Sequence, residues 1–390
     1  MTGFLLAFHP VFRRVALREV HAVDPGAQVV EELDPAAAHV RPAVPRREFV
    51  ARLAAARPVF VRHAAPVELD VDLSEAEDPM ATLVAAFDPS RLDPAKTFAV
   101  ESRKLHVAGE GVPFGARDVE VRLGTCLAER GFPVDMEAPD QLVSVALHRW
   151  RALVGVSRPA DNLSPHADEY RRYSRLPSPV SRAGAKLREA LELWPLDLPA
   201  GRRALDVGAA PGGWTHVLAG LGLRVVAVDP ADLSEVVLAN PLVTHVRARM
   251  ETAGLESESF DLVVNDMNLD PDESAALMCE AAPYLAPGAP AIMTIKVTVR
   301  SPLRLIRGTI AVLQHAYQVH GVRNLFHNRQ EVTVLLRRKA AIRPGWEPLV
   351  GHDPGASARR REWRRSHAMD PGEGEIPLVL RRPAAAVAEG

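Results

Sequence analysis

The chain has 390 residues, of which 47% are hydrophobic and 25% are charged, and its formal net charge is −2. These values predict a soluble globular protein of two or three domains, and the net charge does not point to a polyanionic partner. No apolar run approaches the roughly 20 residues of a membrane span. Residues 1–10 also lack the basic and long apolar regions of a signal peptide.

The two cysteines, Cys126 and Cys279, lie far apart in the sequence. Their separation is not that of metal ligands, so we expect no metal site. We expect both to be buried apolar thiols in a reduced, cytoplasmic protein.

Residues 1–72 form the first predicted domain, a small α/β unit. Strands are expected at residues 4–8, 29–30 and 59–61, and helices at 12–21 and 47–56. Strands that alternate with helices over this length predict a ferredoxin-like sandwich.

Residues 73–160 repeat this alternation. We expect helices at 79–87 and 117–130, and strands at 96–101, 143–147 and 151–156, the last two as a hairpin. Taken in order, the residues at 98–104, 117–120, 124, 131–135 and 154–157 resemble a THUMP domain. The resemblance implies a domain that helps to hold folded RNA. A structural α/β domain, on which Arg103, Lys104 and Arg117 are only solvated, stays open as the alternative.

A polar linker is predicted at residues 161–180. It interleaves arginines with Tyr170 and Tyr173, a composition that suits RNA because guanidinium groups meet phosphates and aromatic rings stack on bases. Basic residues gather here and just beyond, at Arg171, Arg172, Arg175, Arg182, Lys186 and Arg188. They adjoin the site predicted below, which favours contact with an RNA backbone. A solvated hinge is the alternative.

Residues 181–340 alternate strands and helices in the manner of a doubly wound, Rossmann-like sheet. We expect helices at 181–193, 215–221, 271–285 and 302–316, and strands at 204–207, 224–229, 243–246, 260–266, 289–296, 318–323 and 331–337. The last two strands are expected to form an antiparallel pair at one edge. Residues 341–390 are rich in Pro, Gly, Arg and Ala and are predicted to be a disordered tail.

The glycine-rich turn at residues 208–213 is the centre of this predicted sheet. Its glycines let the backbone turn sharply and approach a ligand closely, and the helix that follows offers free N–H groups to a carboxylate. Asp229, at the end of the second strand, is placed to accept hydrogen bonds from ribose hydroxyls. These features predict an adenosine-bearing ligand. Pro211 departs from the dinucleotide-binding pattern and so disfavours NAD as the ligand. A glycine turn that binds NAD, or one that binds no ligand, remains as an alternative.

The block Asp206-x-Gly208-x-x-Pro211-Gly212-Gly213-Trp214 resembles the cofactor turn of the FtsJ-like ribose 2′-O-methyltransferases. The resemblance implies S-adenosylmethionine as the cofactor. The cofactor-binding residues that it implies are Ser181, Asp206, Gly208, Ala210, Pro211, Gly212, Gly213, Trp214, Asp229 and Asp266. Residues 210–213 would contact the methionine part of the cofactor, Ser181 its carboxylate and Asp229 its ribose.

Three charged residues stand where the predicted strands end or begin, and a fourth lies on a helix that can reach them. Asp266 and Lys296 end strands, Glu331 opens the last strand, and Lys186 lies on the helix before the first strand. Because ligands bind at the carboxyl ends of such strands, we expect the four side chains to meet at one mouth. Each alone is as consistent with a surface charge or a helix cap. Together they resemble the Lys-Asp-Lys-Glu tetrad of the FtsJ-like family, which implies that they are catalytic.

The segments around the tetrad resemble one subfamily most closely, the large-subunit ribosomal RNA (cytidine 2′-O)-methyltransferases. The resemblance covers residues 1–340 and rests on 264–267 and 325–333, together with the THUMP-like region and the N-terminal unit, while 181–187 resembles the wider FtsJ-like family. It implies methyl transfer to the ribose 2′-hydroxyl of a cytidine in 23S ribosomal RNA. The implied substrate is the RNA alone or in an assembling particle, and the implied enzyme is a cytoplasmic monomer that does not bind membranes.

The reaction sets a condition on Lys296. A ribose hydroxyl is a poor nucleophile that must lose its proton as it attacks, and a lysine accepts that proton only if its pKa falls toward the working pH. The Lys186 ammonium and partial desolvation would lower the pKa of Lys296, whereas a nearby carboxylate alone would raise it. We expect Lys296 to be the base, Asp266 and Lys186 to orient it, and Glu331 to position the hydroxyl.

Arg249 departs from the family pattern. It stands where the family usually has an acid near the adenine amino group, and arginine cannot accept a hydrogen bond. Glu251 or backbone groups are candidate substitutes. Arg249 is the one feature that favours a non-catalytic RNA-binding or ribosome-assembly factor.

Two further alternatives concern the substrate. A methyltransferase for tRNA or for a base nitrogen stays open, although an enzyme for base amines more often carries an Asn/Asp-Pro-Pro-aromatic motif where this chain has Asn265-Asp-Met-Asn268. An NAD-dependent oxidoreductase is the weakest alternative, because of the proline in the glycine turn.

Overall fold

The computed structural model describes residues 3–105, 109–164, 180–297 and 301–340. The chain divides into two compact units, Met1–Arg172 and Tyr173–Gly390. The predicted RNA-contacting stretch of the linker, including Tyr170 and Tyr173, and the predicted tail at 341–390 lie outside the described residues.

The first unit begins with a four-stranded antiparallel sheet whose strand order is β2-β3-β1-β4. Its elements are β1 (Gly3–Phe8), α1 (Arg13–Val23), β2 (Gln28–Asp34), β3 (Ala37–Arg41), α2 (Arg46–Ala56) and β4 (Val61–Val67). The ring centroids of Phe4 in β1 and Phe49 in α2 lie 4.9 Å apart, and those of Phe12, just before α1, and Phe60, just before β4, lie 4.6 Å apart. Strand β3 was not predicted, because its sequence, Ala-Ala-His-Val-Arg, has weak β propensity.

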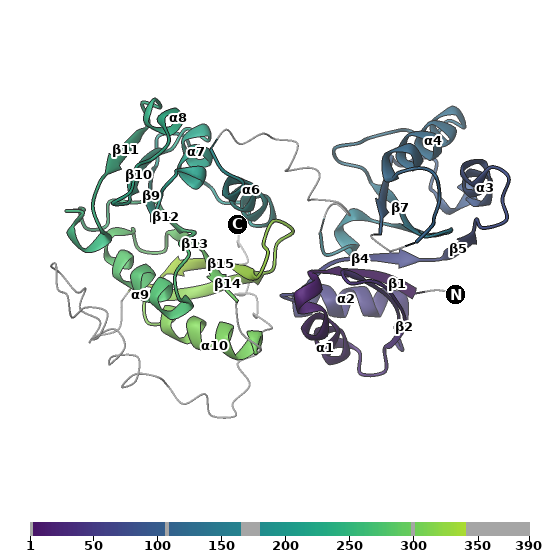
Figure 1. Ribbon diagram of the computed structural model, residues 1–390, viewed down its shortest axis with the longest axis horizontal. Helices are drawn as coiled ribbons and strands as arrows, with labels where there is room; N and C mark the ends of the chain where they lie inside the picture. Colours follow the sequence, from purple (N-terminus) through teal and green to yellow (C-terminus); the bar gives the residue numbers. More distant parts are fainter. Residues whose placement is uncertain (1–2, 106–108, 165–179, 298–300, 341–390) are drawn as a thin grey trace, which may run out of the picture. The chain divides into compact units, whose positions relative to one another are not determined.

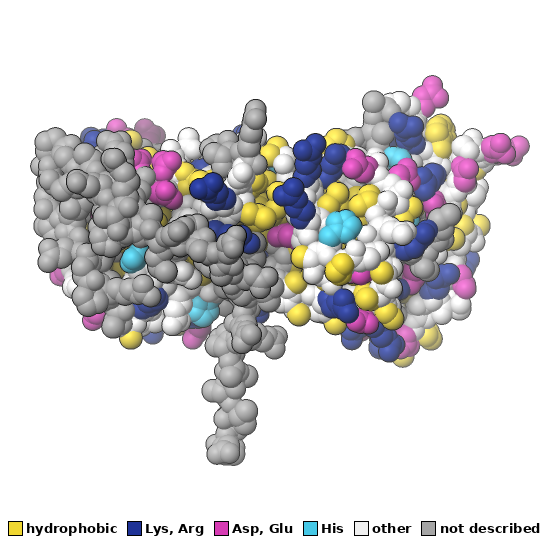
Figure 2. All heavy atoms as spheres, turned by 90° about the horizontal axis from the view of Figure 1, so that it is seen from below, with side chains coloured by type: hydrophobic (Ala, Val, Ile, Leu, Met, Phe, Trp, Pro, Cys, Tyr) yellow, Lys and Arg dark blue, Asp and Glu magenta, His cyan; other side chains and the backbone are white. Residues whose placement is uncertain are grey.

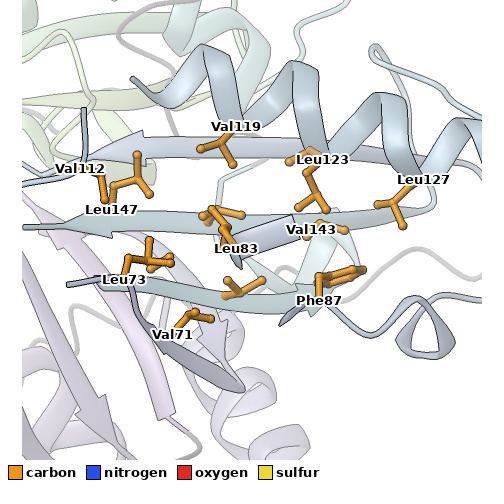
Figure 3. Close-up of a cluster of buried hydrophobic side chains, with 14 of the residues drawn as sticks. Val71, Leu73, Leu83, Phe87, Val112, Val119, Leu123, Leu127, Val143 and Leu147 are labelled. Carbon is orange, nitrogen blue, oxygen red and sulfur yellow. The ribbon is translucent and has the colours of Figure 1, made fainter. Parts of the chain in front are cut away.

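A second four-stranded sheet completes this unit, with the strand order β5-β8-β7-β6. Its elements are β5 (Leu69–Asp72), α3 (Pro79–Ala86), β6 (Phe98–Lys104), α4 (Ala116–Glu129), β7 (Gln141–His148) and β8 (Arg151–Ser157). The predicted hairpin of β7 and β8 is confirmed, and β6 runs parallel to β7. Figure 3 shows Val119, Leu123 and Leu127 of α4 packed over this sheet, within the same apolar core as Leu83 and Phe87.

The two sheets of the first unit share an apolar contact. Leu5 and Val67 of the first sheet cluster with Ala146 and Leu153 of the second.

Lys104 serves this unit structurally, because its Nζ donates to the carbonyl oxygens of Val112 (2.8 Å) and Phe114 (2.9 Å).

The second unit is built on a seven-stranded sheet with the order β11-β10-β9-β12-β13-β15-β14 (Figure 1). Its strands are β9 (Arg203–Val207), β10 (Arg224–Val228), β11 (Val243–Val246), β12 (Leu262–Asn265), β13 (Pro290–Lys296), β14 (Tyr317–Arg323) and β15 (Glu331–Arg338). Strands β9 to β13 are parallel, and β15 is antiparallel to both β13 and β14. The predicted antiparallel edge pair is therefore confirmed.

Helices pack on both sides of this sheet, as a doubly wound fold requires. They are α6 (Ala183–Leu193), α7 (Gly213–Gly220), α8 (Glu235–Leu238), α9 (Pro271–Ala281) and α10 (Pro302–Leu313). Helices α6 and α7 pack together, as do α9 and α10 on the other side (Figure 1). Helix α9 stops before the predicted residue 285 and gives way to a 3₁₀ turn at Ala282–Tyr284, because Pro283 cannot donate a helical hydrogen bond.

No helix among the described residues is long and apolar enough to cross a membrane.

Cys279 is buried as expected, but Cys126 is half-buried on α4. On the face shown in Figure 2, basic side chains lie among acidic and apolar ones, consistent with a formal net charge of −2.

The core of the second sheet generates a stability prediction. Leu123 is 1% exposed in the cluster of Figure 3, so Leu123→Ala is expected to lower the free energy of unfolding by about 2–5 kcal/mol. Val121, on the same helix, is 52% exposed, and Val121→Ala is the matched control, with an expected change of about 0.5 kcal/mol or less. Urea titration followed by circular dichroism measures both, and equal effects of the two substitutions would contradict this packing.

Candidate active site

Four charged side chains meet at the carboxyl edge of the seven-stranded sheet. Asp266 directly follows β12, Lys296 is the last residue of β13, and Glu331 is the first residue of β15. Lys296 and Glu331 are paired in the register of β13 with β15, so the sheet itself places them side by side. The fourth side chain, Lys186, comes from α6.

The four side chains form a closed ring of alternating charge. Lys186 Nζ lies 2.7 Å from Asp266 Oδ1 and 3.0 Å from Glu331 Oε1. Lys296 Nζ lies 3.1 Å from Asp266 Oδ1 and also donates to Glu331 Oε2. Each carboxylate therefore contacts both ammonium groups, and no side chain of the ring is more than 16% exposed. Their convergence at one mouth, predicted from the strand ends, is what the structure shows.

The ring fixes the charge state of two of its members. Burial by itself would lower the pKa of Lys296, but the carboxylates of Asp266 and Glu331 outweigh it and hold this pKa above its ordinary value. Burial would likewise raise the pKa of Glu331, but Lys186 and Lys296 keep it below its ordinary value. The ring therefore does not give Lys296 the lowered pKa that a basic lysine requires. Lys296 is an ammonium there, and Glu331 is a carboxylate.

Thr294 holds the Asp266 side chain, and Asn265 holds the backbone turn that follows β12; neither role was predicted. Thr294 Oγ1 donates to Asp266 Oδ1 at 2.7 Å. Asn265 is fully buried, and its side chain accepts from the amide of Met267 (2.9 Å) and donates to Ser274 Oγ (3.2 Å). The signal for Thr294 was its position two residues before Lys296, since residues two apart in a strand share a face.

The glycine turn lies beside this ring. Gly208 (φ 72°) and Gly212 (φ 103°) adopt left-handed backbone conformations. A Cβ at Gly208 would also lie 2.1 Å from the Met267 side chain, and one at Gly213 would lie 2.1 Å from Ser181 Oγ. The turn therefore needs glycine for its shape and for close contact with Met267 and Ser181.

The acidic residues of the turn divide into an inner and an outer group. Asp206 is 2% exposed and accepts from Thr215 Oγ1 at 2.6 Å. Burial raises the pKa of Asp206 to about 7. The hydrogen bond from Thr215 lowers this pKa, and the negative charges of Asp266 and Asp229 raise it. Asp229 is half-buried at the end of β10 and accepts from the amides of Ala210 (3.0 Å) and Ala231 (2.8 Å).

The side chains of Trp214 and Arg249 lie in contrasting surroundings. Trp214, predicted to bind the cofactor, is 3% exposed, and its Nε1 donates to the Ala183 carbonyl at 2.8 Å, which joins α7 to α6. Arg249 is exposed at the start of the 3₁₀ turn Met250–Thr252, and its carbonyl accepts from Thr252 Oγ1. Glu251, its suggested substitute, is half-buried in the same turn.

Comparison with known proteins gives a consistent family. Residues 179–324 match the family model described as FtsJ-like methyltransferase. The ribosomal RNA large subunit methyltransferase M of Azoarcus sp. is 34% identical over 179 residues, 42% of this chain and 48% of the relative. The protein of the same name from Edwardsiella ictaluri is 32% identical over 222 residues, 53% of this chain and 56% of the relative. The chain thus spans about half the length of these two relatives.

A third relative of that name, from Alkalilimnicola ehrlichii, is 30% identical over 300 residues, 72% of this chain and 79% of the relative. Among solved structures, TrmN from Thermus thermophilus covers 87% of this chain and 100% of its own at 21% identity, with a TM-score of 0.35, which is too low to support an inference.

The mostly parallel sheet and the glycine turn, together with the match over residues 179–324, define an FtsJ-like methyltransferase domain in the second unit. The chain as a whole belongs to the family of the ribosomal RNA large subunit methyltransferases M, as the long match to the Alkalilimnicola relative shows. The FtsJ-like match implies S-adenosylmethionine as the cofactor.

The turn generates a prediction about cofactor binding. Gly208→Ala is expected to weaken S-adenosylmethionine binding at least about tenfold, because an alanine there is strained and collides with Met267. Gly220→Ala, at the end of α7 with no atom within 4 Å of the added methyl, is the matched control. Isothermal titration calorimetry measures both affinities. Wild-type affinity in Gly208→Ala would show that the turn tolerates a side chain.

Asp206 generates a prediction about pH. A carboxyl whose pKa is raised on folding favours the folded state while it is protonated, so its contribution is lost as the pH rises from about 4 through about 7. Asp206→Asn removes this dependence. The unfolding free energy of the variant is expected to rise relative to the wild type by roughly 2–3 kcal/mol between pH 5 and pH 8. Chemical denaturation at both pH values tests this, and a difference independent of pH would contradict it.

Proposed function

We propose that the protein transfers a methyl group from S-adenosylmethionine to a ribose 2′-hydroxyl of RNA, and that its substrate is a cytidine in 23S ribosomal RNA. The observation that carries the proposal is the ring of Lys186, Asp266, Lys296 and Glu331 beside the glycine turn. The name shared by its relatives supports ribosomal RNA as the substrate.

The cofactor fits the residues around the turn. The amides in the first turn of α7 have no acceptor within the helix and suit a carboxylate. Asp229 ends β10 with a half-buried carboxylate that can accept from ribose hydroxyls, and Ser181 lies against Gly213 at the start of α7. When bound, S-adenosylmethionine supplies an electrophilic methyl group.

Lys296 first has to lose a proton to solvent before it can accept one. It is an ammonium in the ring, where it donates to Asp266 and Glu331. Burial is the largest influence that opposes this charge, and RNA covering the mouth of the site would exclude more water and increase it. Lys186, which shares both carboxylates, also disfavours a second positive charge. Lys296 would then take the proton of the hydroxyl as that oxygen bonds to the methyl carbon and the bond from this carbon to the sulfonium sulfur of the cofactor breaks.

The two carboxylates keep the reacting groups in line. Asp266 is held by Thr294 and contacts both lysines, so it orients Lys296. Glu331 accepts hydrogen bonds and is placed to accept one from the ribose hydroxyl. Correct alignment accounts for much of the rate in such a reaction, which adds to the importance of holding both groups firmly.

We infer that the first unit binds the RNA through two domains. Its first six elements follow the order β-α-β-β-α-β, with the sheet order β2-β3-β1-β4, which supports a ferredoxin-like domain. The THUMP-like domain follows from about residue 69 rather than residue 73, because β5 pairs with β8 in the second sheet. Residues 161–180 would link these domains to the methyltransferase domain at 181–340.

Transfer of a labelled methyl group tests the proposed function. Large-subunit ribosomal RNA and tRNA from a strain lacking this gene are incubated separately with labelled S-adenosylmethionine. We expect the wild type to label ribosomal RNA, and Lys296→Ala to reduce the rate by at least about a thousandfold, since general base catalysis and the alignment of the ring are both lost.

Arg224→Ala provides the control, because Arg224 is exposed at the opposite, amino-terminal end of β10 and its variant should retain activity. Label confined to tRNA would overturn the choice of substrate. No label on either RNA, together with no binding of the cofactor, would favour a non-catalytic RNA-binding factor.

A further inference from the structure

Glu189 is a buried carboxylate one helical turn beyond Lys186. It lies on α6 and is 3% exposed. Residues three apart on a helix share a face, so Lys186 and Glu189 project from the same side of α6. A carboxylate at this depth is stable only when hydrogen-bond donors surround it.

The donors to Glu189 come from one segment, residues 324–330, which we name the β14–β15 loop. The amide of Phe326 donates to Glu189 Oε1 at 2.7 Å, and the amide of His327 donates to Oε2 at 3.0 Å. His327 Nδ1 lies 2.9 Å from Oε2 and is the donor, because a carboxylate can only accept. Glu189 therefore fastens this loop to α6.

The β14–β15 loop in turn holds Glu331 of the catalytic ring. Asn324 Nδ2 donates to the Glu331 carbonyl at 2.6 Å, and Asn328 Nδ2 lies 3.5 Å from Glu331 Oε1. Asn328 Oδ1 accepts from the amide of Leu325 (2.8 Å) and from Thr333 Oγ1 (3.1 Å). Both asparagines are 1% exposed, so the loop is a hydrogen-bonded frame around the first residue of β15.

We propose that Glu189 is a positioning residue for methyl transfer, which fixes Glu331 relative to Lys186 through the β14–β15 loop. Helix α6 then contributes to the ring in two ways. It supplies the Lys186 ammonium, and through Glu189 it holds the loop that leads into Glu331, which pairs with Lys186. The effect of Glu189 on catalysis rests on the proposed function, whereas its hold on the loop does not.

Glu189→Gln removes the clamp with almost no change in side-chain volume. Oε1 of Glu189 accepts from the Phe326 amide, and Oε2 accepts from the His327 amide and from His327 Nδ1. A glutamine must place its NH₂ group at one of these two positions, where an N–H donor then faces another N–H donor and a hydrogen bond is lost. We expect the loop to loosen and the rate of methyl transfer to fall about 10–100-fold, as when the supporting partner of a catalytic ligand is lost. The Kd for S-adenosylmethionine should change by less than about twofold, since the clamp lies outside the glycine turn.

Coupling to Glu331 separates positioning from a general structural role. Single-turnover rates are measured for the wild type, Glu189→Gln, Glu331→Gln and the double variant. If Glu189 acts through Glu331, its loss should add less than about twofold once Glu331 is gone. Glu192→Gln, the same change at an exposed position of α6, is the control and should keep the wild-type rate. Multiplicative losses in the double variant, or a Glu189→Gln rate equal to that of Glu192→Gln, would overturn the inference.

Amide hydrogen exchange provides a test that needs no activity. In Glu189→Gln, the peptide covering residues 324–331 should exchange at least about tenfold faster, while α7 and β10 keep their protection. If the wild type methylates no RNA, the proposed function fails, and this measurement alone decides whether the clamp exists. Unchanged protection of 324–331 would overturn it.

A second variant keeps the test intact should Glu189→Gln fail to fold. His327→Ala removes one donor and leaves both amide bonds to Glu189. We expect it to lose about 3–10-fold in rate, again with no further loss in the Glu331→Gln background. A full loss that multiplies with Glu331→Gln would count against the clamp.

Discussion

Mutual neutralisation of four largely buried charges is the constraint on which the site depends. An isolated carboxylate or ammonium at this depth would be costly, but in the ring each acid meets two lysines and each lysine meets two acids. The same arrangement holds the pKa of Lys296 above its ordinary value and so favours its charged form. Lys296 can serve as the proposed base only if further desolvation shifts this balance.

The topology of the sheet brings these charges together from distant parts of the chain. Parallel strands end at one edge, which places Asp266 near Lys296, and the antiparallel β15 begins where β13 ends, which places Glu331 opposite Lys296. Only Lys186 comes from outside the sheet. The position of α6 therefore decides whether Lys186 reaches the two carboxylates. Two sets of hydrogen bonds hold α6: Trp214 donates to the Ala183 carbonyl near its start, and Glu189 accepts from the β14–β15 loop further along.

The sequence allowed much of this site to be predicted, because strand ends and glycine turns leave local signals. Asp266, Lys296 and Glu331 followed apolar runs or opened them, and the seven strands of the second unit were anticipated. Thr294, Asn265 and Glu189 were missed, since their roles depend on contacts between distant segments. The direction of the Lys296 pKa could not be decided from the sequence, because it depends on the balance between burial and two carboxylates. Strands β3 and β5 lacked a clear β pattern.

The central claim is that this ring activates a ribose hydroxyl rather than a base nitrogen. The most direct measurement is the position of the methyl group in labelled RNA after alkaline hydrolysis, because a 2′-O-methyl group blocks attack of that oxygen on the adjacent phosphate. We expect the label to be recovered in alkali-resistant dinucleotides that begin with cytidine. Label recovered in mononucleotides with a methylated base would contradict it.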